Sequence, residues 1–218
     1  MKKIFFLLTL AVCCLQINGF AQKSRVGITG GLVLAKMRGE IGGVDQKGES
    51  KLGFHAGFIV DAPISKHFSF QPALQYVQKG QVAQESVIIN QDKIETELRY
   101  LELPLNFVYN SNYYGNNFYI GAGPYAAFNL PSKIVTTLGG DGVKAEEDLA
   151  FGNTSSEDYR GVDFGVNAII GMRSKSGIFL ALNYSLGLRN LNPQGALLQG
   201  DIKNSYFGLN VGWLFSNK

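Results

Sequence analysis

The chain has 218 residues, a length that fits one domain, and its 45% hydrophobic and 17% charged residues exclude an intrinsically disordered protein. Glycine is frequent, with 27 residues against 6 prolines, and aromatic residues make up 12%, which favours many strands and turns over a helical bundle. The net charge of +3 comes from scattered Lys and Arg residues without a cluster of basic and aromatic side chains, so a nucleic-acid partner is excluded.

Residues 1–21 have the pattern of a secretory signal peptide. Two lysines precede the apolar run Ile4–Leu15, and Gly19-Phe20-Ala21 places small residues before the predicted cleavage. The alternative is an uncleaved anchor helix, but the run is shorter than the roughly 20 residues that span a bilayer. Both cysteines lie in this segment, so we expect the mature domain, residues 22–218, to have no thiol, disulfide or cysteine metal site.

The mature chain shows strict alternation of apolar residues with small or polar ones, which is typical of β-strands with one apolar face. Eight segments have this pattern: Arg25–Leu34, Leu52–Asp61, Phe68–Lys79, Tyr100–Tyr109, Phe118–Asn129, Gly161–Ile170, Leu180–Arg189 and Tyr206–Phe215. They predict an all-β fold, an eight-stranded antiparallel up-and-down barrel. The apolar face points outward in a transmembrane barrel and inward in a soluble lipocalin-like carrier, so the position of Leu103, Leu182 and Val211 separates the two interpretations.

The connections between these segments alternate in length. Three are short, namely Pro63–His67, Asn110–Asn117 and Arg173–Gly177. Four are long and polar, namely Lys36–Lys51, Gly80–Lys93, Pro131–Asp158 and Asn190–Asn204. Short turns at one rim and long loops at the other are the arrangement of an outer membrane barrel, with both termini on the short-turn side.

Aromatic residues fall near the two ends of the predicted strands. Those at the short-turn end are Phe68, Phe70, Phe107, Tyr109, Phe118, Trp213 and Phe215. Those nearer the long loops are Phe54, Tyr76, Phe128 and Phe207. This distribution predicts two girdles at the depth of the lipid headgroups, whereas the core of a sandwich, the other explanation, gives no reason for a preference for the rims.

An eight-stranded barrel is just wide enough for its own side chains, which restricts what it can transport. The polar face offers these lumen candidates: Glu102, Asp61, Asp163, Lys79, Arg189, Asn106, Asn167, Asn183 and Gln75. Opposite charges and hydrogen-bonding groups in a narrow lumen predict a plug and not a general diffusion pore. Pro72, Pro104 and Pro124 lie inside predicted strands, and because proline donates no ladder hydrogen bond, we expect each at a bulge or beside a carbonyl served by water or a side chain.

The order of these segments resembles the PorT-like outer membrane β-barrel family of the Bacteroidetes group. The similar motifs are Gln71–Gly80, Tyr100–Leu105, Gly121–Tyr125, Asp163-Phe164-Gly165, Tyr184–Leu188 with Asn190, and the closing strand Gly208–Phe215. A departure is the Ser216-Asn217-Lys218 tail, since such barrels often end at the aromatic residue. The resemblance implies a porin-family barrel in the outer membrane of the Gram-negative cell envelope and accounts for Pro72 and Pro104. It implies no single activity, although some members are linked to protein secretion.

The sequence contains no recognisable catalytic or cofactor motif, so we expect no enzyme, no cofactor and no catalytic, cofactor-binding or metal residues. His67 is interpreted as a solvated turn residue, and His55 as a structural hydrogen-bonding group on the lumen side. An acidic stretch that includes Asp141 and Glu146-Glu147-Asp148 has ligands suited to calcium, but we interpret it as a solvated outward loop.

The leading hypothesis is therefore an outer membrane barrel with a structural or interaction role through its long extracellular loops. We expect a monomer that contacts outer membrane lipid and envelope or secretion proteins. The alternatives are a narrow conduit or secretion-associated component, and a soluble lipocalin-like carrier.

Overall fold

The computed structural model describes residues 24–41, 44–45, 49–87, 90–112, 115–137, 144–152, 157–193 and 200–215. The predicted signal peptide and its cleavage position lie outside these residues. The strands are β1 Arg25–Ile41, β2 Val44–Asp45, β3 Glu49–Pro63, β4 Phe68–Val87, β5 Asn90–Asn110, β6 Asn117–Thr137, β7 Lys144–Asp148, β8 Val162–Arg173, β9 Ile178–Gly187 and β10 Gly200–Phe215. In this part of the chain, no helix is long and apolar enough to cross a membrane.

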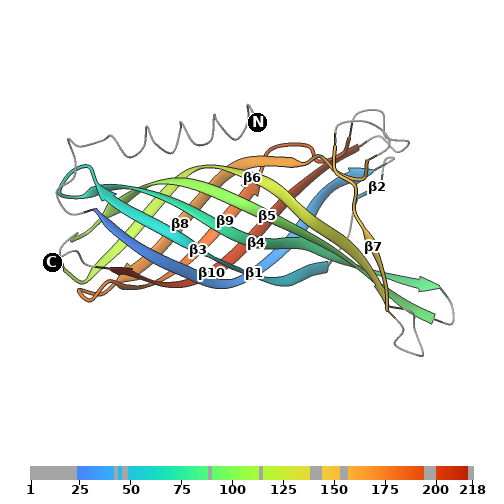
Figure 1. The fold of residues 1–218 in the computed structure, drawn as a ribbon, viewed down its shortest axis with the longest axis horizontal. Helices are drawn as coiled ribbons and strands as arrows, with labels where there is room; N and C mark the ends of the chain where they lie inside the picture. The colour runs from blue at the N-terminus through green and yellow to red at the C-terminus, as the bar shows by residue number, and fades with distance from the viewer. Residues whose placement is uncertain are drawn as a thin grey trace.

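Eight of the described strands close into a barrel. Antiparallel pairs join β1 to β3, β3 to β4, β4 to β5, β5 to β6, β6 to β8, β8 to β9 and β9 to β10. The ring closes because β10 pairs with β1 from Val26↔Phe215 to Ile41↔Gly200, and these strands lie side by side in Figure 1. Closure pairs the backbone groups that would otherwise face hydrocarbon unsatisfied. The predicted eight-stranded up-and-down barrel is confirmed.

The apolar face of the strands points outward. Leu182 and Val211 keep 58% and 55% of their surface exposed, whereas the intervening Asn183 and Asn210 are buried in the lumen. Leu103 is half-buried on the same outward phase, between the buried Glu102 and Pro104. A soluble carrier with an apolar interior is therefore not supported, since this surface would leave leucine and valine in water.

The short connections are as predicted, but all four predicted long loops contain strand: β1 continues to Ile41, β3 begins at Glu49 and β10 begins at Gly200, and the other two loops are strand in part. β4 and β5 stay paired as far as Val87↔Asn90, and β6 continues to Thr137, where it pairs with β7. The prediction of loops over 80–93 and 131–158 is wrong for residues 80–87, 90–93, 131–137 and 144–148, which are strand. Beyond the apolar zone the outward residues Lys93, Glu95 and Glu97 are charged while Val82, Thr96 and Leu98 stay buried, so the apolar outward face ends although the ladder continues.

The three prolines interrupt ladders without shifting their register. Pairing of β4 with β5 is missing between Pro72↔Leu105 and Gln75↔Glu102, and pairing of β5 with β6 is missing between Pro104↔Tyr125 and Phe107↔Ala122, but the strands resume in the same register. Of the two alternatives expected for the prolines, the bulge is wrong, and a neighbouring carbonyl served by water or a side chain stays a prediction. Register shifts occur nearer the long-loop end, between Ser50 and His55 and between Glu97 and Arg99.

The aromatic residues form contacts at both ends of the apolar zone, in agreement with the predicted girdles. At the short-turn end, ring centroids lie 5.4 Å apart for Phe68 and Tyr109 and 5.0 Å apart for Trp213 and Phe215. Toward the long loops, Phe54 contacts Tyr76 at 5.5 Å and Tyr184 contacts Phe207 at 4.6 Å. Amphipathic rings at these two levels mark the boundaries of the hydrocarbon layer.

Candidate functional site

The lumen is filled by a buried charged cluster beneath its long-loop end. The Nζ atom of Lys79, on β4, lies 2.7 Å from Oε2 of Glu102 and 3.4 Å from Oδ2 of Asp163, and all three side chains are at most 1% exposed. The lysine is required because two buried carboxylates without a cation would carry a large desolvation cost. Strands β4, β5 and β8 bring these residues together, as their shared lumen phase predicts.

Tyrosines surround the Lys79 ammonium group. Its Nζ lies 5.0, 4.6 and 5.2 Å from the ring centroids of Tyr100, Tyr125 and Tyr206, which adds cation–π attraction. The hydroxyl of Tyr206 donates to Oε1 of Glu102 at 2.7 Å, and that of Tyr125 donates to Oδ2 of Asp163 at 3.3 Å. The aromatic rings thus fill space and also satisfy the carboxylates, so the cluster is a plug and not an open polar channel.

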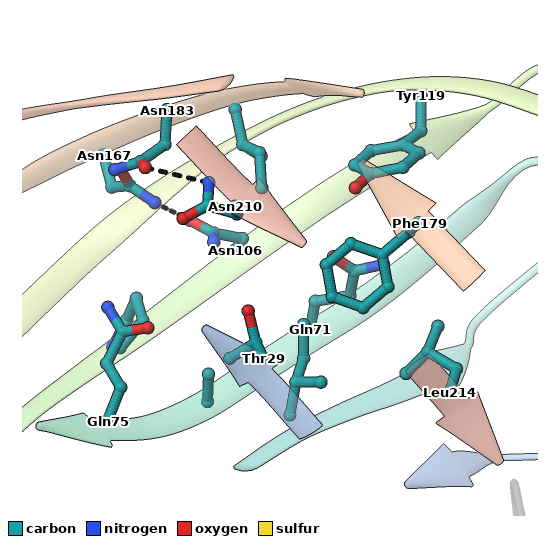
Figure 2. Close-up of a pocket in the computed structure, with 14 residues that line it drawn as sticks. Thr29, Gln71, Gln75, Asn106, Tyr119, Asn167, Phe179, Asn183, Asn210 and Leu214 are labelled. Atoms are coloured by element: carbon teal, nitrogen blue, oxygen red, sulfur yellow. Dashed lines mark hydrogen bonds between the residues drawn. The ribbon is translucent and has the colours of Figure 1, made fainter. Parts of the chain in front are cut away.

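A layer of asparagines lies below this cluster. Its members are Asn106 on β5, Asn167 on β8, Asn183 on β9 and Asn210 on β10, and Figure 2 shows them. Nδ2 of Asn210 donates to Oδ1 of Asn183, Nδ2 of Asn183 to Oδ1 of Asn167, and Nδ2 of Asn167 to Oδ1 of Asn106, at 2.9, 3.3 and 3.1 Å. A cavity of about 40 Å³ lies beside this chain of amides, with Gln75 also on its wall. This volume holds a few water molecules at most and gives no passage for a solute.

A second ionic cluster closes the lumen at the short-turn end. Nη1 of Arg173 lies 2.6 Å from Oδ2 of Asp61, and its Nη2 donates to Oδ1 of Asn110 at 3.3 Å. Gln71 donates to the other oxygen of Asp61, at 3.0 Å. Arg173 was predicted to lie in a turn, because from sequence a polar residue at a strand end looks the same whether it faces solvent or the lumen.

Eight of the nine lumen candidates point into the barrel, and Arg189 does not. Gln75 is half-buried and donates to Oε1 of Glu102 at 3.2 Å, and the others are buried. The Cζ atom of Arg189 lies 5.8 Å from the ring centroid of Phe164, which is exposed on the outer face. β9 ends at Gly187, so the alternation that assigned Arg189 to the lumen no longer applies there.

The long-loop mouth of the lumen is covered by the chain that follows β7. Leu149, Phe151 and Tyr159 pack against an inner apolar cluster that includes Tyr100 and Ile202. Phe151 forms a β-bridge with Tyr159, and burial raises the pKa of the Tyr159 phenol. The described part of this segment therefore packs over the inner apolar cluster at the long-loop end of the lumen.

The two histidines occupy different environments. His55 is buried on the lumen side, as predicted, beside Asn210 and Gln75. Neither of its ring nitrogens has a hydrogen-bond partner among the described residues. His67 is exposed, as expected for a turn, and its ring stacks on Tyr109 at 5.7 Å while Nδ1 lies 3.1 Å from the carbonyl oxygen of Asn110.

The residues considered for calcium do not converge within the described chain. Glu146, Glu147 and Asp148 are exposed along β7, and no group of three or more His, Cys, Asp or Glu side chains in the described ranges could hold a metal ion. Asp141 lies outside those ranges.

The family assignment follows from the match between the sequence and known domains. Residues 20–192 match the family described as "Outer membrane protein beta-barrel domain", which covers most of the chain. This chain belongs to that family. Its closed ring and outward apolar face agree with the assignment, so the protein is an outer membrane β-barrel protein.

Several solved outer membrane barrels are similar to this chain. Ail of Yersinia pestis, in complex with the heparin analogue sucrose octasulfate, has 13% identity and a TM-score of 0.46 over 89% of this chain and 100% of its own. OprG of Pseudomonas aeruginosa has 12% identity and a TM-score of 0.46 over 89% and 97%. Neisserial surface protein A has 11% identity and a TM-score of 0.44 over 87% and 97%. Comparison with curated protein sequences finds no match.

Proposed function

We propose that this outer membrane barrel is a structural and interaction protein that presents its extracellular strands and loops to a ligand or partner protein. The observation that carries the proposal is a contrast between two parts of the barrel. Two ionic clusters fill the described lumen, and the cavity beside the asparagine layer measures about 40 Å³, whereas the outer strands continue far beyond the girdle. The protein therefore has an elaborated outer surface and a blocked interior.

The outer surface is a sheet that rises from the barrel. β4, β5, β6 and β7 form it, because β6 pairs with β7 from Lys133↔Asp148 to Thr137↔Lys144, where β8 no longer accompanies it. Figure 1 shows the β4–β5 hairpin and β6 with β7 extending past the ends of β8 and β9. We call this part, residues 80–87, 90–98, 129–137 and 144–148, the extracellular sheet.

Ion pairs hold the extracellular sheet in shape. Glu95 contacts Lys93 at 2.5 Å and Lys51 at 3.1 Å, and Lys133 contacts Glu146 at 2.6 Å. The hydrogen bond from Lys93 is the main cause that lowers the pKa of Glu95, with a further contribution from Lys51. A sheet with fixed charges on its surface suits recognition better than an unstructured loop, because less conformational entropy is lost on binding.

The filled lumen favours this function over a narrow conduit. A conduit needs a continuous path, but Lys79 with Glu102 blocks the upper lumen and Arg173 with Asp61 blocks the lower one. Moving either pair aside leaves buried charges without partners.

We infer that the chain belongs to the PorT-like branch of the family, which supports a secretion-associated partner for the extracellular or periplasmic surface. The motifs behind this inference are Tyr100–Leu105 and Gly121–Tyr125. They lie on adjacent strands, where Pro104 is the register partner of Tyr125. Normal protein secretion in a deletion strain would contradict the secretion-associated partner.

Complementation of a deletion strain tests the interaction role against the conduit role. One variant replaces residues 84–93 with an Asn-Gly turn, which shortens the extracellular sheet, and a second, Asn106→Ala, widens the lumen. We expect wild-type and Asn106→Ala proteins to restore the envelope phenotype and the hairpin variant to fail, although all three show heat-modifiable gel mobility. Planar bilayer recordings of the wild-type protein should show no conductance. Full complementation by the hairpin variant would refute the proposal.

A further inference from the structure

A primary amine and a carboxyl group meet inside the lumen, where water is excluded. Nζ of Lys79 lies 3.4 Å from Oδ2 of Asp163, and both side chains have no exposed surface. The two residues are 84 positions apart in the chain, on β4 and β8, and no strand pairing joins these strands. The fold therefore holds an amine against a carboxyl group from another part of the barrel wall.

Glu102 is placed to accept a proton from this amine. Its Oε2 atom lies 2.7 Å from Nζ of Lys79, within the distance of about 2.6–3.2 Å over which a general base acts. Its Oε1 atom accepts hydrogen bonds from Tyr206 at 2.7 Å and from Gln75 at 3.2 Å, which fix the carboxyl group. Proton transfer turns two buried charges into two neutral groups, which a water-excluded site favours. A neutral, desolvated lysine amine is a nucleophile.

The two oxygen atoms of Asp163 have different surroundings. Oδ2 accepts hydrogen bonds from the hydroxyl of Tyr125 at 3.3 Å and from Nδ2 of Asn204 at 3.4 Å. Donors aimed at one oxygen stabilise the negative charge that develops there when an amine attacks the carboxyl carbon. Oδ1 has no hydrogen-bond partner among the described residues, so it is the oxygen that can leave. The side chain of Asp163 is thus arranged as an electrophile.

Tyrosine rings close the space around the amine. Nζ of Lys79 lies 5.0, 4.6 and 5.2 Å from the ring centroids of Tyr100, Tyr125 and Tyr206. These rings keep out the water that would favour the separate acid and amine, and the packed lumen fixes both reactants in place. Holding two reactants at about 3–3.5 Å replaces a slow encounter in solution by a step within one molecule.

We propose that Lys79 and Asp163 condense to an intramolecular isopeptide bond, with Glu102 as the acid–base group. Glu102 takes a proton from the ammonium group, and Nζ forms a bond to Cγ of Asp163. The bond from Cγ to Oδ1 then breaks, and Oδ1 leaves as water with two protons that came from Nζ by way of Glu102. The amide nitrogen keeps one hydrogen, Glu102 returns to its starting form, and nothing is oxidised or reduced.

The isopeptide bond joins β4 to β8 covalently inside the barrel. No cysteine follows Cys14 in the sequence, so a disulfide cannot supply such a connection in the barrel domain. A cross-link between residues this far apart restricts the unfolded chain and stabilises the fold. The inference concerns the lumen alone and does not depend on the interaction role of the extracellular sheet.

Intact-mass spectrometry of the full chain tests the proposal. The protein is produced as inclusion bodies, dissolved in urea and refolded into detergent, and a sample of the same batch stays in urea. The refolded protein is expected to weigh about 18 Da less than the sample in urea, the mass of one water. Tandem mass spectrometry of a digest should then show the peptide with Lys79 joined to the peptide with Asp163.

Three variants separate the roles of the residues. Lys79→Arg keeps a cation without the primary amine, so its mass should not change on refolding. Glu102→Gln removes the acid–base group and should form the bond roughly a hundredfold more slowly. The matched control is Lys93→Arg, which replaces a lysine that also contacts a glutamate but is 48% exposed, and it should lose water as the wild type does. Heat-modifiable gel mobility verifies that each variant folds.

A wild-type protein that refolds and keeps its full mass would overturn the proposal. The same loss of mass in Lys79→Arg would also overturn it, because the water would then come from another part of the chain. A link from Lys79 to Glu102, or a loss of about 17 Da with a link to Asn204, would overturn the assignment of Asp163 as the electrophile. The complementation results for the extracellular sheet are unaffected by any of these outcomes.

Discussion

The Nζ atom of Lys79 lies 2.7 Å from Oε2 of Glu102 in the barrel lumen, and neither side chain is more than 1% exposed. The two residues are not directly opposite each other on β4 and β5. Lys79 is the register partner of Leu98, and Glu102 is the register partner of Gln75. The ion pair therefore joins two levels of the same strand pair. Asp163, from β8 across the lumen, contacts the same ammonium group and connects the pair to the far wall.

Replacing this lysine is expected to destabilise the barrel strongly. Lys79→Met leaves Glu102 and Asp163 buried without their cation, which should lower the free energy of unfolding by about 3–5 kcal/mol. The measurement is a urea titration followed by heat-modifiable gel mobility. Adding Glu102→Gln to the same chain should recover part of the loss, because one buried charge is then removed.

Lys93→Met is the matched control for this prediction. Its ammonium group also contacts a glutamate, Glu95, but its side chain is 48% exposed. An exposed pair contributes about 1 kcal/mol or less, so the unfolding midpoint should move little. A similar loss for Lys93→Met and Lys79→Met would show that the buried cluster has no special role.

The single tryptophan of the chain reports the depth of the periplasmic girdle. Trp213 lies on the outer face, and its Nε1 donates to the carbonyl oxygen of Ser176 in the β8–β9 turn at 2.9 Å. In bilayers, lipids brominated near the glycerol end of the acyl chain should quench its fluorescence more than lipids brominated near the terminal methyl. Leu182→Trp in a Trp213→Phe background should reverse this order, since Leu182 lies in the middle of β9. Stronger quenching of Trp213 from the bilayer centre would contradict the placement of the girdle.

The sequence predicted the ring and the charged cluster because both depend on an alternation of period two. Once the outward leucines and valines fix the phase of each strand, Lys79, Glu102 and Asp163 must all face the same lumen. Strand ends carry no such signal. Arg173 therefore looked like a turn residue and Arg189 like a lumen residue. In the structure Arg173 faces the lumen from the end of β8, and Arg189 lies past the end of β9 over the outward ring of Phe164.

The extracellular sheet was missed for a related physical reason. Beyond the girdle the outward residues Lys93, Glu95 and Glu97 are charged, whereas Thr96 and Leu98 between them are buried. The hydrogen-bond ladder itself continues there, from Gly80↔Glu97 to Val87↔Asn90. Because the outward residues change from apolar to charged there, the alternation that marks the membrane strands is lost, and the polar composition predicts a loop.

Acid is expected to loosen the extracellular sheet near Glu95. The hydrogen bond from Lys93 lowers the pKa of Glu95, so the carboxylate contributes stability that is present above the unfolded-state pKa, about 4.3, and is lost as the pH falls through the lower folded-state pKa. Amides of residues 93–96 should exchange faster at pH 3 than at pH 6 after correction for intrinsic rates. Glu95→Gln should remove this pH dependence. A wild-type profile identical to that of the variant would exclude Glu95 as its cause.

The orientation of the strands predicts how the barrel responds to a charge at different depths. Leu182 lies in the middle of β9, opposite Leu209 and Ile170 on its neighbours, and Leu188 lies just beyond the extracellular end of the strand. Both keep more than half of their surface exposed on the outer face, at 58% and 51%.

Arginine at these two positions should therefore have unequal costs. Leu182→Arg is expected to lower the free energy of unfolding by about 2–4 kcal/mol, because its guanidinium group enters hydrocarbon near the bilayer centre. Leu188→Arg should cost about 1 kcal/mol or less, since its side chain reaches the headgroups. Reversible urea unfolding in bilayers of defined thickness measures both values. Equal costs at the two positions would mean that Leu182 does not face lipid, and the outward apolar surface would no longer support a membrane-spanning barrel.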